Sequence, residues 1–356
     1  MVKTIREAIG KLIDKQDLTY IEAYESMREI MSGQATPAQI GAFLTSLRAK
    51  GETIEEIIAF TTVMREFSFK IHPKINGRLI DTCGTGGDKI KTFNISTASA
   101  FIAAGAGIKV AKHGNRSVTS RCGSADVMEK LGFNLAAKPE TIEKAIESIG
   151  IGFMYAPVFH PAMRNAANPR REIGIRTVFN ILGPLSNPAP INAQIIGVYD
   201  ASLIEKIARV LRDLGLEEAM VVHGLDGLDE ISTTGETRIA WLKSEEINMI
   251  NIKPEEFGVR RASIEEISGI DPDKNAELMF KILYGLLRNG DPKMDIVLVN
   301  AAASIIVGGK GESFDYAMEL ARESIKSGLA YKKLRELIDF CNGDLGKLER
   351  LEVKYA

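Results

Sequence analysis

The sequence is poor in cysteine and lacks the patterns that give cysteine a structural or metal-binding role. Three cysteines occur in 356 residues, at Cys83, Cys122 and Cys341. Their number is odd, their spacing is wide, and no Cys-x-x-Cys pair or histidine–cysteine cluster is present. The pattern argues against a disulfide framework and against a zinc site, and it favours a reducing, cytoplasmic location.

An excess of positive charge is also missing. The chain has 45 Lys and Arg against 47 Asp and Glu, which gives a formal net charge of −2. A chain without an overall basic field is not expected to bind nucleic acid, although local basic loops can still hold small phosphates.

Long apolar runs are absent as well. The most apolar stretch, residues 98–111, is shorter than the ~20 apolar residues that a membrane-spanning helix needs. Near the N-terminus Glu7 and Asp14 interrupt the basic residues, so no targeting segment is expected. We therefore predict no membrane partner.

The first 70 residues have the pattern of a helical bundle. Three capping boxes follow one another, formed by Thr19 with Glu22, Thr36 with Gln39, and Thr53 with Glu56. Pro37 would stand at the first helical position, where its missing N–H costs nothing. We predict a small N-terminal helical domain.

From residue 78 onward, short apolar strands alternate with helices. The expected strands are residues 78–82, 109–112, 133–135, 153–156, 194–199 and 219–223. The expected helices are residues 95–106, 124–131, 139–149 and 201–214, each closed by a glycine (Gly107, Gly132, Gly150, Gly215). The alternation predicts the α/β class, with a mostly parallel central sheet flanked by helices and ligands at the carboxyl ends of its strands.

Three other segments complete the predicted organisation. Residues 160–187 are polar, basic and flanked by prolines, and we expect helices there that return to the N-terminal bundle. An antiparallel hairpin is expected over residues 236–252, with strands at 238–242 and 247–252. The C-terminal helices are expected at 272–288, 293–307, 313–327 and 329–341. The predicted domains are therefore residues 1–70, completed by about 160–187, and residues 75–159 with 188–356.

The most informative motif is a glycine-rich turn between a strand and a helix. Gly84, Gly86 and Gly87 let the backbone approach a ligand closely, and Asn94 is a candidate N-cap for the following helix. Ser96 and Thr97 would then place N–H groups and hydroxyls at the positive helix end, which attracts phosphate. Asp88 adds a carboxylate that suits a metal–phosphate or ribose-diol site. The alternative is a tight turn with only a structural role.

A second polar cluster follows the next predicted strand. Lys112 offers a charge for a phosphate, and Asn115 can both donate and accept hydrogen bonds to a small polar substrate. Ser124 is expected to cap the next helix and so create a second positive helix end. The alternatives are a solvated surface for Lys112 and Arg116 and a hydrogen-bonded loop histidine for His113.

Two more clusters bring acids and arginines. Asp229 and Glu230 follow a predicted strand, and paired carboxylates are hard oxygen ligands suited to Mg²⁺, although acidic pairs are also common on surfaces. His160 precedes four arginines, Arg164, Arg170, Arg171 and Arg176. One of these planar guanidinium groups could clamp the carboxylate of an acceptor.

Together these clusters predict a site for a sugar phosphate bearing pyrophosphate, for Mg²⁺, and for a second substrate that carries a carboxylate. No nucleophile–base–orienter triad is present. That absence fits a reaction that depends mostly on positioning and electrostatics.

Over essentially its whole length the chain resembles the anthranilate phosphoribosyltransferases of tryptophan biosynthesis. The resemblance rests on Gly-Thr-Gly-Gly-Asp at 84–88, Asn-Ile-Ser-Thr at 94–97, Lys-His-Gly-Asn-Arg at 112–116, Gly-Ser-Ala-Asp at 123–126, His-Pro-Ala-Met at 160–163, the run from Arg176 to Leu185, and Asp229-Glu230. The Lys-His-Gly-Asn-Arg run is the most specific of these.

The resemblance implies transfer of the phosphoribosyl group of 5-phosphoribosyl 1-pyrophosphate to anthranilate, with Mg²⁺, in a homodimer joined through the helical domain. It implies that the donor is bound by Gly84, Thr85, Gly86, Gly87, Asp88, Thr92, Asn94, Ser96, Thr97, Lys112 and Ser124. It implies that anthranilate is bound by Gly84, His113, Asn115, Arg170 and Pro184. It further implies Mg²⁺ ligation by Asp229 and Glu230, with Ser96 assisting, and an electrostatic role for Lys112.

Two alternatives remain open at this point. A pyrimidine nucleoside phosphorylase has a similar two-domain plan but uses inorganic phosphate and a nucleoside without Mg²⁺, and the acidic pair argues against it. A nucleic-acid-binding relative of the fold should have a basic surface, whereas this chain is slightly acidic.

Overall fold

The computed structural model describes residues 4–87, 90–117, 122–269 and 271–355. Its N-terminal part is a bundle of four helices, α1 (Ile5–Ile13), α2 (Tyr20–Met31), α3 (Pro37–Lys50) and α4 (Ile54–Glu66). The three capping boxes at Thr19, Thr36 and Thr53 are confirmed, because each threonine accepts the N3 backbone N–H and each N3 side chain returns to the N-cap. Phe43 and Phe60 meet edge to face in the fully buried core of the bundle.

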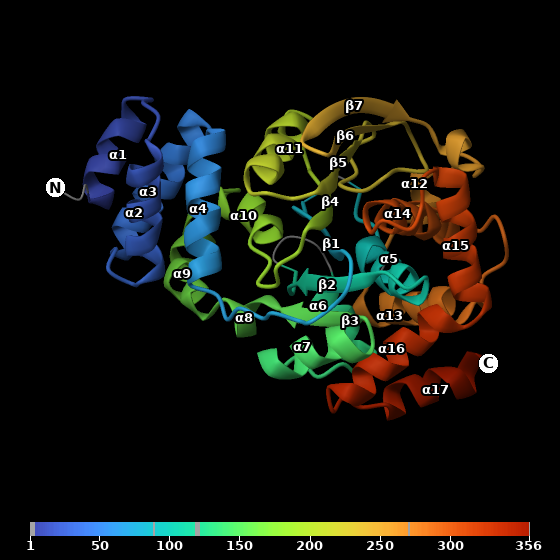
Figure 1. Cartoon of the computed structure of the whole chain (residues 1–356). Coiled ribbons are helices and arrows are strands. Elements are labelled where there is room, and N and C mark those ends of the chain that lie inside the picture. The colour runs from blue at the N-terminus through green and yellow to red at the C-terminus, as the bar shows by residue number, and fades with distance from the viewer. Residues whose placement is uncertain (1–3, 88–89, 118–121, 270, 356) are drawn as a thin grey trace.

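The larger part of the molecule is built on one seven-stranded sheet with the order β3-β2-β1-β4-β5-β6-β7 (Figure 1). The strands are β1 (Leu79–Gly84), β2 (Lys109–Gly114), β3 (Ile151–Tyr155), β4 (Ala193–Gly197), β5 (Glu218–Gly224), β6 (Thr237–Lys243) and β7 (Glu246–Ile252). The first five are parallel, and β6 and β7 extend the sheet as an antiparallel hairpin. The predicted fold class is therefore confirmed.

The strand expected at residues 133–135 is wrong. Phe133 is buried against Phe153, which explains its strand-like apolar character, but its backbone N–H donates to the Met128 carbonyl and closes the preceding helix. Because this N–H is already bonded to the helix, it is not available to pair with a neighbouring strand.

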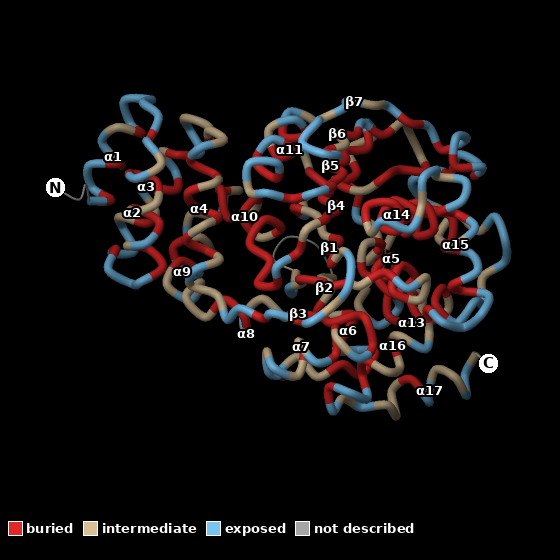
Figure 2. Tube along the Cα trace, in the orientation of Figure 1, coloured by how far each residue is buried: buried red, intermediate tan, exposed pale blue. Residues whose placement is uncertain are grey.

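Helices cover both faces of the sheet. The elements of the α/β part are α5 (Ile95–Gly105), α6 (Ser124–Lys130), α7 (Pro139–Ser148), α11 (Leu203–Asp213), η2 (Pro254–Phe257), α12 (Ile264–Ile267), α13 (Pro272–Tyr284), α14 (Pro292–Val307), α15 (Phe314–Lys326), α16 (Leu329–Phe340) and α17 (Gly346–Tyr355). The buried helices α5 and α14 pack against one sheet face, whereas α11 packs against the other (Figures 1 and 2). The last helix, α17, was not expected from the sequence.

The middle segment returns to the bundle, as expected. It comprises α8 (Ala156–Phe159), η1 (Pro161–Met163), α9 (Arg164–Ile173) and α10 (Phe179–Leu185). α9 packs on α2 and α3, and the Asn165 amide donates to the Met31 carbonyl at 2.9 Å. α10 meets α4, where Arg65 Nε donates to the Leu185 carbonyl at 3.0 Å. The assignment of 160–187 to the helical domain remains our prediction.

Among the described helices, none combines the length and the apolar character that a membrane crossing requires.

Candidate functional site

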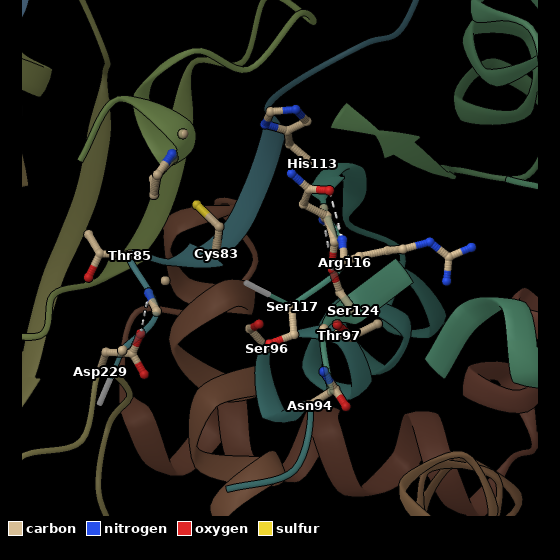
Figure 3. Close-up of a pocket in the computed structure, with 18 of the residues that line it drawn as sticks. Cys83, Thr85, Asn94, Ser96, Thr97, His113, Arg116, Ser117, Ser124 and Asp229 are labelled. Atoms are coloured by element: carbon tan, nitrogen blue, oxygen red, sulfur yellow. Dashed lines mark hydrogen bonds between the residues drawn. The ribbon is translucent and has the colours of Figure 1, made fainter. Parts of the chain in front are cut away.

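A cavity of about 330 Å³ opens at the carboxyl ends of β1 and β2, between the α/β part and the middle segment. Every predicted site residue that the structure describes lines it: Gly84, Thr85, Gly86, Gly87, Thr92, Asn94, Ser96, Thr97, Lys112, His113, Asn115, Ser124, Arg170, Pro184, Asp229 and Glu230. Asp88, also predicted, lies outside the described residues. Figure 3 shows the start of α5 facing Asp229, with His113 at the end of β2.

The glycine loop after β1 has the backbone that its sequence predicts. Gly86 and Gly87 have φ of 67° and 79°, a left-handed conformation that other residues adopt only with strain. At Gly84 the constraint is space, because a Cβ there would lie 2.6 Å from Asp229 Oδ2. The Gly86 N–H donates to Asp229 Oδ2 at 2.8 Å, so this loop already binds an anionic oxygen of the chain itself.

The helix that follows the loop begins at the predicted place but is not capped as expected. Asn94 occupies the N-cap position of α5, yet its side chain accepts no capping bond and instead donates to the Cys122 carbonyl at 3.4 Å. The Ser96 N–H is taken by Glu230 Oε1 at 3.2 Å. Within the described chain, the buried hydroxyl of Thr97 has no hydrogen-bond partner. The first turn of α5 therefore presents donors to the acids across the cavity.

Lys112 is buried, so its reading as a solvated surface residue is wrong. Only 3% of the residue is exposed, and Nζ donates to the Thr82 carbonyl at 2.5 Å and to Ser96 Oγ at 3.4 Å. Next to it lies the fully buried carboxylate of Asp81, which accepts from Asn187 Nδ2 at 2.8 Å. Burial raises the pKa of Asp81, and the positive charge of Lys112 opposes that rise. A cation held in place at the cavity wall is suited to a phosphate.

Arg116 behaves differently from its neighbour. Its guanidinium is partly exposed and pairs with Asp126 and Glu129, both at 2.8 Å, which fits the reading as a surface residue. Ser124 corrects another expectation, since Gly123 is the N-cap of α6 and Ser124 is its first residue. Its hydroxyl instead contacts the backbone of Asn115, accepting from N–H at 3.2 Å and lying 3.3 Å from the carbonyl.

The acidic pair has the chemistry that Mg²⁺ requires. Asp229 and Glu230 supply hard carboxylate oxygens at the cavity wall, and Ser96 supplies a hydroxyl nearby. Burial raises the pKa of Asp229, so this carboxylate lacks a counter-charge that fully offsets its desolvation. No cluster of three or more acidic, histidine or cysteine ligands occurs in the described chain. Two carboxylates fit a cation that takes its remaining ligands from substrate phosphates and water.

The middle segment contributes one arginine to the cavity wall. Among the three candidates on α9, only Arg170 lines the cavity; Arg164 is exposed, and Arg171 is exposed and bonds Asn168. The Arg170 guanidinium lies 4.8 Å from the centre of the Phe179 ring. In the described part of the chain it makes no ion pair. Burial lowers its pKa, although an arginine remains cationic.

Several lining residues were not predicted from the sequence. They are Cys83, Lys91, Phe93, Ile95, Gly114, Arg116, Ser117, Cys122, Gly123, Ala156, Phe179, Asn180 and Gly183. Phe179, Asn180 and Gly183 belong to the motif from Arg176 to Leu185. The sequence therefore contained a signal for these three residues that was not used to predict site residues. The two cysteines, Cys83 near the end of β1 and Cys122 in a loop, belong to no cysteine motif that could have indicated them.

Two buried histidines lie side by side, His113 on β2 and His160 between α8 and η1. The rings of His113 and His160 are 5.0 Å apart, and the Nε2 atoms of both are buried without a partner in the described chain. Burial, with His160 as the second cause, lowers the pKa of His113 to about 3, and burial lowers the pKa of His160 to about 4. Both imidazoles are therefore neutral in the folded protein at pH 6.

This pair predicts a loss of stability in acid. The unfolded histidines take up protons near pH 6.5, whereas the folded ones do not until about pH 4. Stability is thus complete above pH 6.5 and falls as pH is lowered toward 4, by up to about 1.4 kcal/mol per pH unit for each histidine. Denaturant unfolding from pH 7 to 4.5 should show a smaller slope for His160→Gln than for the parent. Exposed His72→Gln is the control, and an unchanged slope in His160→Gln would contradict the assignment.

Comparison with known proteins gives the same picture. The family model described as "Glycosyl transferase family, a/b domain" matches residues 76–331, and "Glycosyl transferase family, helical bundle domain" matches residues 6–68. An anthranilate phosphoribosyltransferase of Persephonella marina is 50% identical over 95% of this chain and 99% of its own length. One of Methanocorpusculum labreanum is 51% identical over 95% and 98%.

Solved structures agree. The anthranilate phosphoribosyltransferase of Thermus thermophilus superposes with a TM-score of 0.88 at 40% identity, covering 94% of this chain and 99% of that one. The Saccharomyces cerevisiae enzyme in complex with PRPP and Mg gives a TM-score of 0.87 at 28% identity, covering 95% and 98%. This chain belongs to the anthranilate phosphoribosyltransferase family.

Proposed function

We propose that the protein transfers the phosphoribosyl group of 5-phosphoribosyl 1-pyrophosphate to the amine of anthranilate, giving N-(5-phosphoribosyl)anthranilate and pyrophosphate. The observation that carries the proposal is that one cavity brings together two kinds of anion-binding group. The first is a glycine loop with a buried lysine and two carboxylates, and the second is an arginine that makes no ion pair within the described chain. Such a site can hold a diphosphate and a carboxylate at the same time.

The donor belongs at the end formed by the glycine loop and α5. We assign its binding to Gly84, Thr85, Gly86, Gly87, Asp88, Thr92, Asn94, Ser96, Thr97, Lys112 and Ser124. The left-handed glycines, the helix N-terminus and the fixed Lys112 cation support this assignment. Asp229, Glu230 and Ser96 would hold Mg²⁺. When bound there, Mg²⁺ would neutralise charge on the departing pyrophosphate.

Anthranilate belongs at the part of the cavity formed by α9 and α10 of the middle segment. The Arg170 guanidinium would meet its carboxylate, and Asn115 would hydrogen-bond its polar groups. Gly84, His113 and Pro184 would line its path.

The chemical step needs little from the protein beyond placement. The amine nitrogen attacks ribose C1 while the bond from C1 to the pyrophosphate oxygen breaks, and the bonding electrons leave with pyrophosphate. The transition state resembles an oxocarbenium ion, and Lys112 stabilises the negative charge that grows on the leaving group. The proton that the nitrogen then releases passes to water, so no strong base is required.

The first test is the fluorescence of anthranilate, which falls when its amine is ribosylated. Loss of fluorescence is expected only when protein, 5-phosphoribosyl 1-pyrophosphate and Mg²⁺ are all present, and chelator should stop it. If the protein ribosylates another amine but not anthranilate, the assignment of the donor site stands and anthranilate is not the acceptor. Phosphorolysis of a pyrimidine nucleoside, or a salt-sensitive gel shift, would favour the two alternative functions instead.

Two further features of the biology are part of the proposal. We place the enzyme in the cytoplasm, which suits three cysteines that form no disulfide within the described chain. We also expect a homodimer joined through the helical domain, because Ile13 and Ile21 on α1 and α2 are 65% and 72% exposed. Light scattering should then give twice the chain mass of 38.9 kDa.

A further inference from the structure

Arg176 contacts the glycine loop from outside the cavity. It lies between α9 and α10 and is not among the residues that line the cavity. Its Nη2 nevertheless donates a hydrogen bond to the Gly87 carbonyl. The guanidinium also stacks on Tyr199, with Cζ 4.3 Å from the centre of the ring. The middle segment thus reaches the donor-binding loop through one side chain.

Tyr199 connects the same loop to the sheet. It follows β4, and its backbone N–H donates to Thr85 Oγ1 at 3.0 Å. The Thr85 N–H in turn donates to the Gly197 carbonyl at 2.9 Å. The arginine therefore stacks on a residue that is itself bonded to the start of the loop. Arg176, Tyr199 and Thr85 therefore form one connected group that contacts the glycine loop at both Thr85 and Gly87.

The loop needs such an external support. Three of its four residues from Gly84 to Gly87 are glycines, which have the largest conformational freedom of all residues. Backbone N–H groups bind a phosphate well only when they are held pointing to one place. In this structure Gly86 is held by Asp229, and Gly87 is held by Arg176.

We propose that Arg176 is a positioning residue: by holding the Gly87 carbonyl while stacked on Tyr199, it fixes the glycine loop in the conformation that receives the donor pyrophosphate. It does not line the cavity and acts through Gly87. This inference rests on the proposed function, because it assumes that the loop binds the donor. It predicts that loss of Arg176 changes the KM for the donor without a matching change in the KM for the acceptor.

The test is steady-state kinetics with each substrate varied in turn, together with calorimetric binding of 5-phosphoribosyl 1-pyrophosphate and Mg²⁺. Arg176→Gln should raise the KM for the donor about ten-fold, the size expected for one lost hydrogen bond to a charged group. The KM for anthranilate should change by less than about two-fold. Arg171→Gln, an exposed arginine on the same segment, is the matched control and should behave as the parent.

Conservative variants separate the parts of the contact. Tyr199→Phe keeps the ring and should match the parent, whereas Tyr199→Leu should raise the donor KM about three-fold. Arg176→Lys keeps the charge but not the planar fork, so it should recover only part of the donor affinity. Melting curves show whether each variant folds. If Arg176→Gln does not fold, the comparison of Tyr199→Leu with Tyr199→Phe tests the inference instead.

Three outcomes decide the matter. A donor KM within two-fold of the parent in Arg176→Gln overturns the inference, and so does an equal rise of both KM values. A parent protein that neither binds nor turns over the donor overturns the proposed function and the inference with it.

Discussion

Replacing Asp229 by asparagine together with Glu230 by glutamine is expected to lower kcat by roughly 10²–10³-fold. The pair supplies the only two carboxylates of the described cavity wall, and Asp229 is 8% exposed. The double variant keeps the shape of both side chains and removes the two negative charges that would hold the cation. The rate should be measured over a range of Mg²⁺ concentrations, with the loss greatest where Mg²⁺ is limiting.

Folding of this variant is not expected to suffer. Burial already raises the pKa of Asp229, so a neutral amide of the same size is no harder to bury. The amide oxygen that Asp229→Asn introduces can still accept from the Gly86 N–H. The matched control is Glu245→Gln with Glu246→Gln, another adjacent acidic pair but exposed at the turn between β6 and β7. Near-normal turnover of Asp229→Asn/Glu230→Gln at limiting Mg²⁺ would refute a metal role for the acids.

The position of the site was predictable because it depends on a rule about sheets. Gly84 ends β1 and Gly114 ends β2, and both strands are parallel neighbours in the sheet. The loops that follow parallel strands emerge at one edge, so motifs far apart in the sequence meet there. The acids after β5 reach the same cavity for the same reason. Strand order was not needed for this step.

The contacts within the site were less predictable. Asn94 and Ser124 have the composition of N-caps, yet each uses its side chain for a tertiary hydrogen bond instead. Lys112 looks like a surface residue in the sequence, but Asp81 and the carbonyl of Thr82 make its burial possible. Local propensity indicates which residues can cap a helix or lie at the surface within one segment. Whether a side chain does so depends on the hydrogen-bond partners that a second segment places beside it.

Contacts between segments far apart in the chain could not be predicted from the sequence. Nothing local distinguishes Arg164, Arg170 and Arg171, because their directions follow from how α9 sits against α2 and α3. The contact between Arg176 and Gly87 joins residues 89 positions apart. Such contacts are set by the packing of the middle segment, which no periodicity within the segment reveals.

Arg170→Ala is expected to raise the KM for anthranilate by about 10–100-fold and to leave the donor KM within about two-fold. Arg170 is the α9 arginine that lines the cavity. Its guanidinium lies over the Phe179 ring and makes no ion pair among the described residues. A carboxylate that binds there gains a charge-assisted, two-point hydrogen bond, and alanine removes all of it.

Substrate analogues test whether the carboxylate is the group that Arg170 recognises. Inhibition by benzoate, which carries the carboxylate without the amine, should weaken by a factor similar to the rise in KM. Arg170→Lys should fall between the parent and Arg170→Ala, because an ammonium cannot make the paired contact. The neighbouring Arg171→Gln is the control, since Arg171 is exposed and bonds only Asn168 in the described chain. A rise confined to the donor KM would instead place Arg170 at the phosphate end of the cavity.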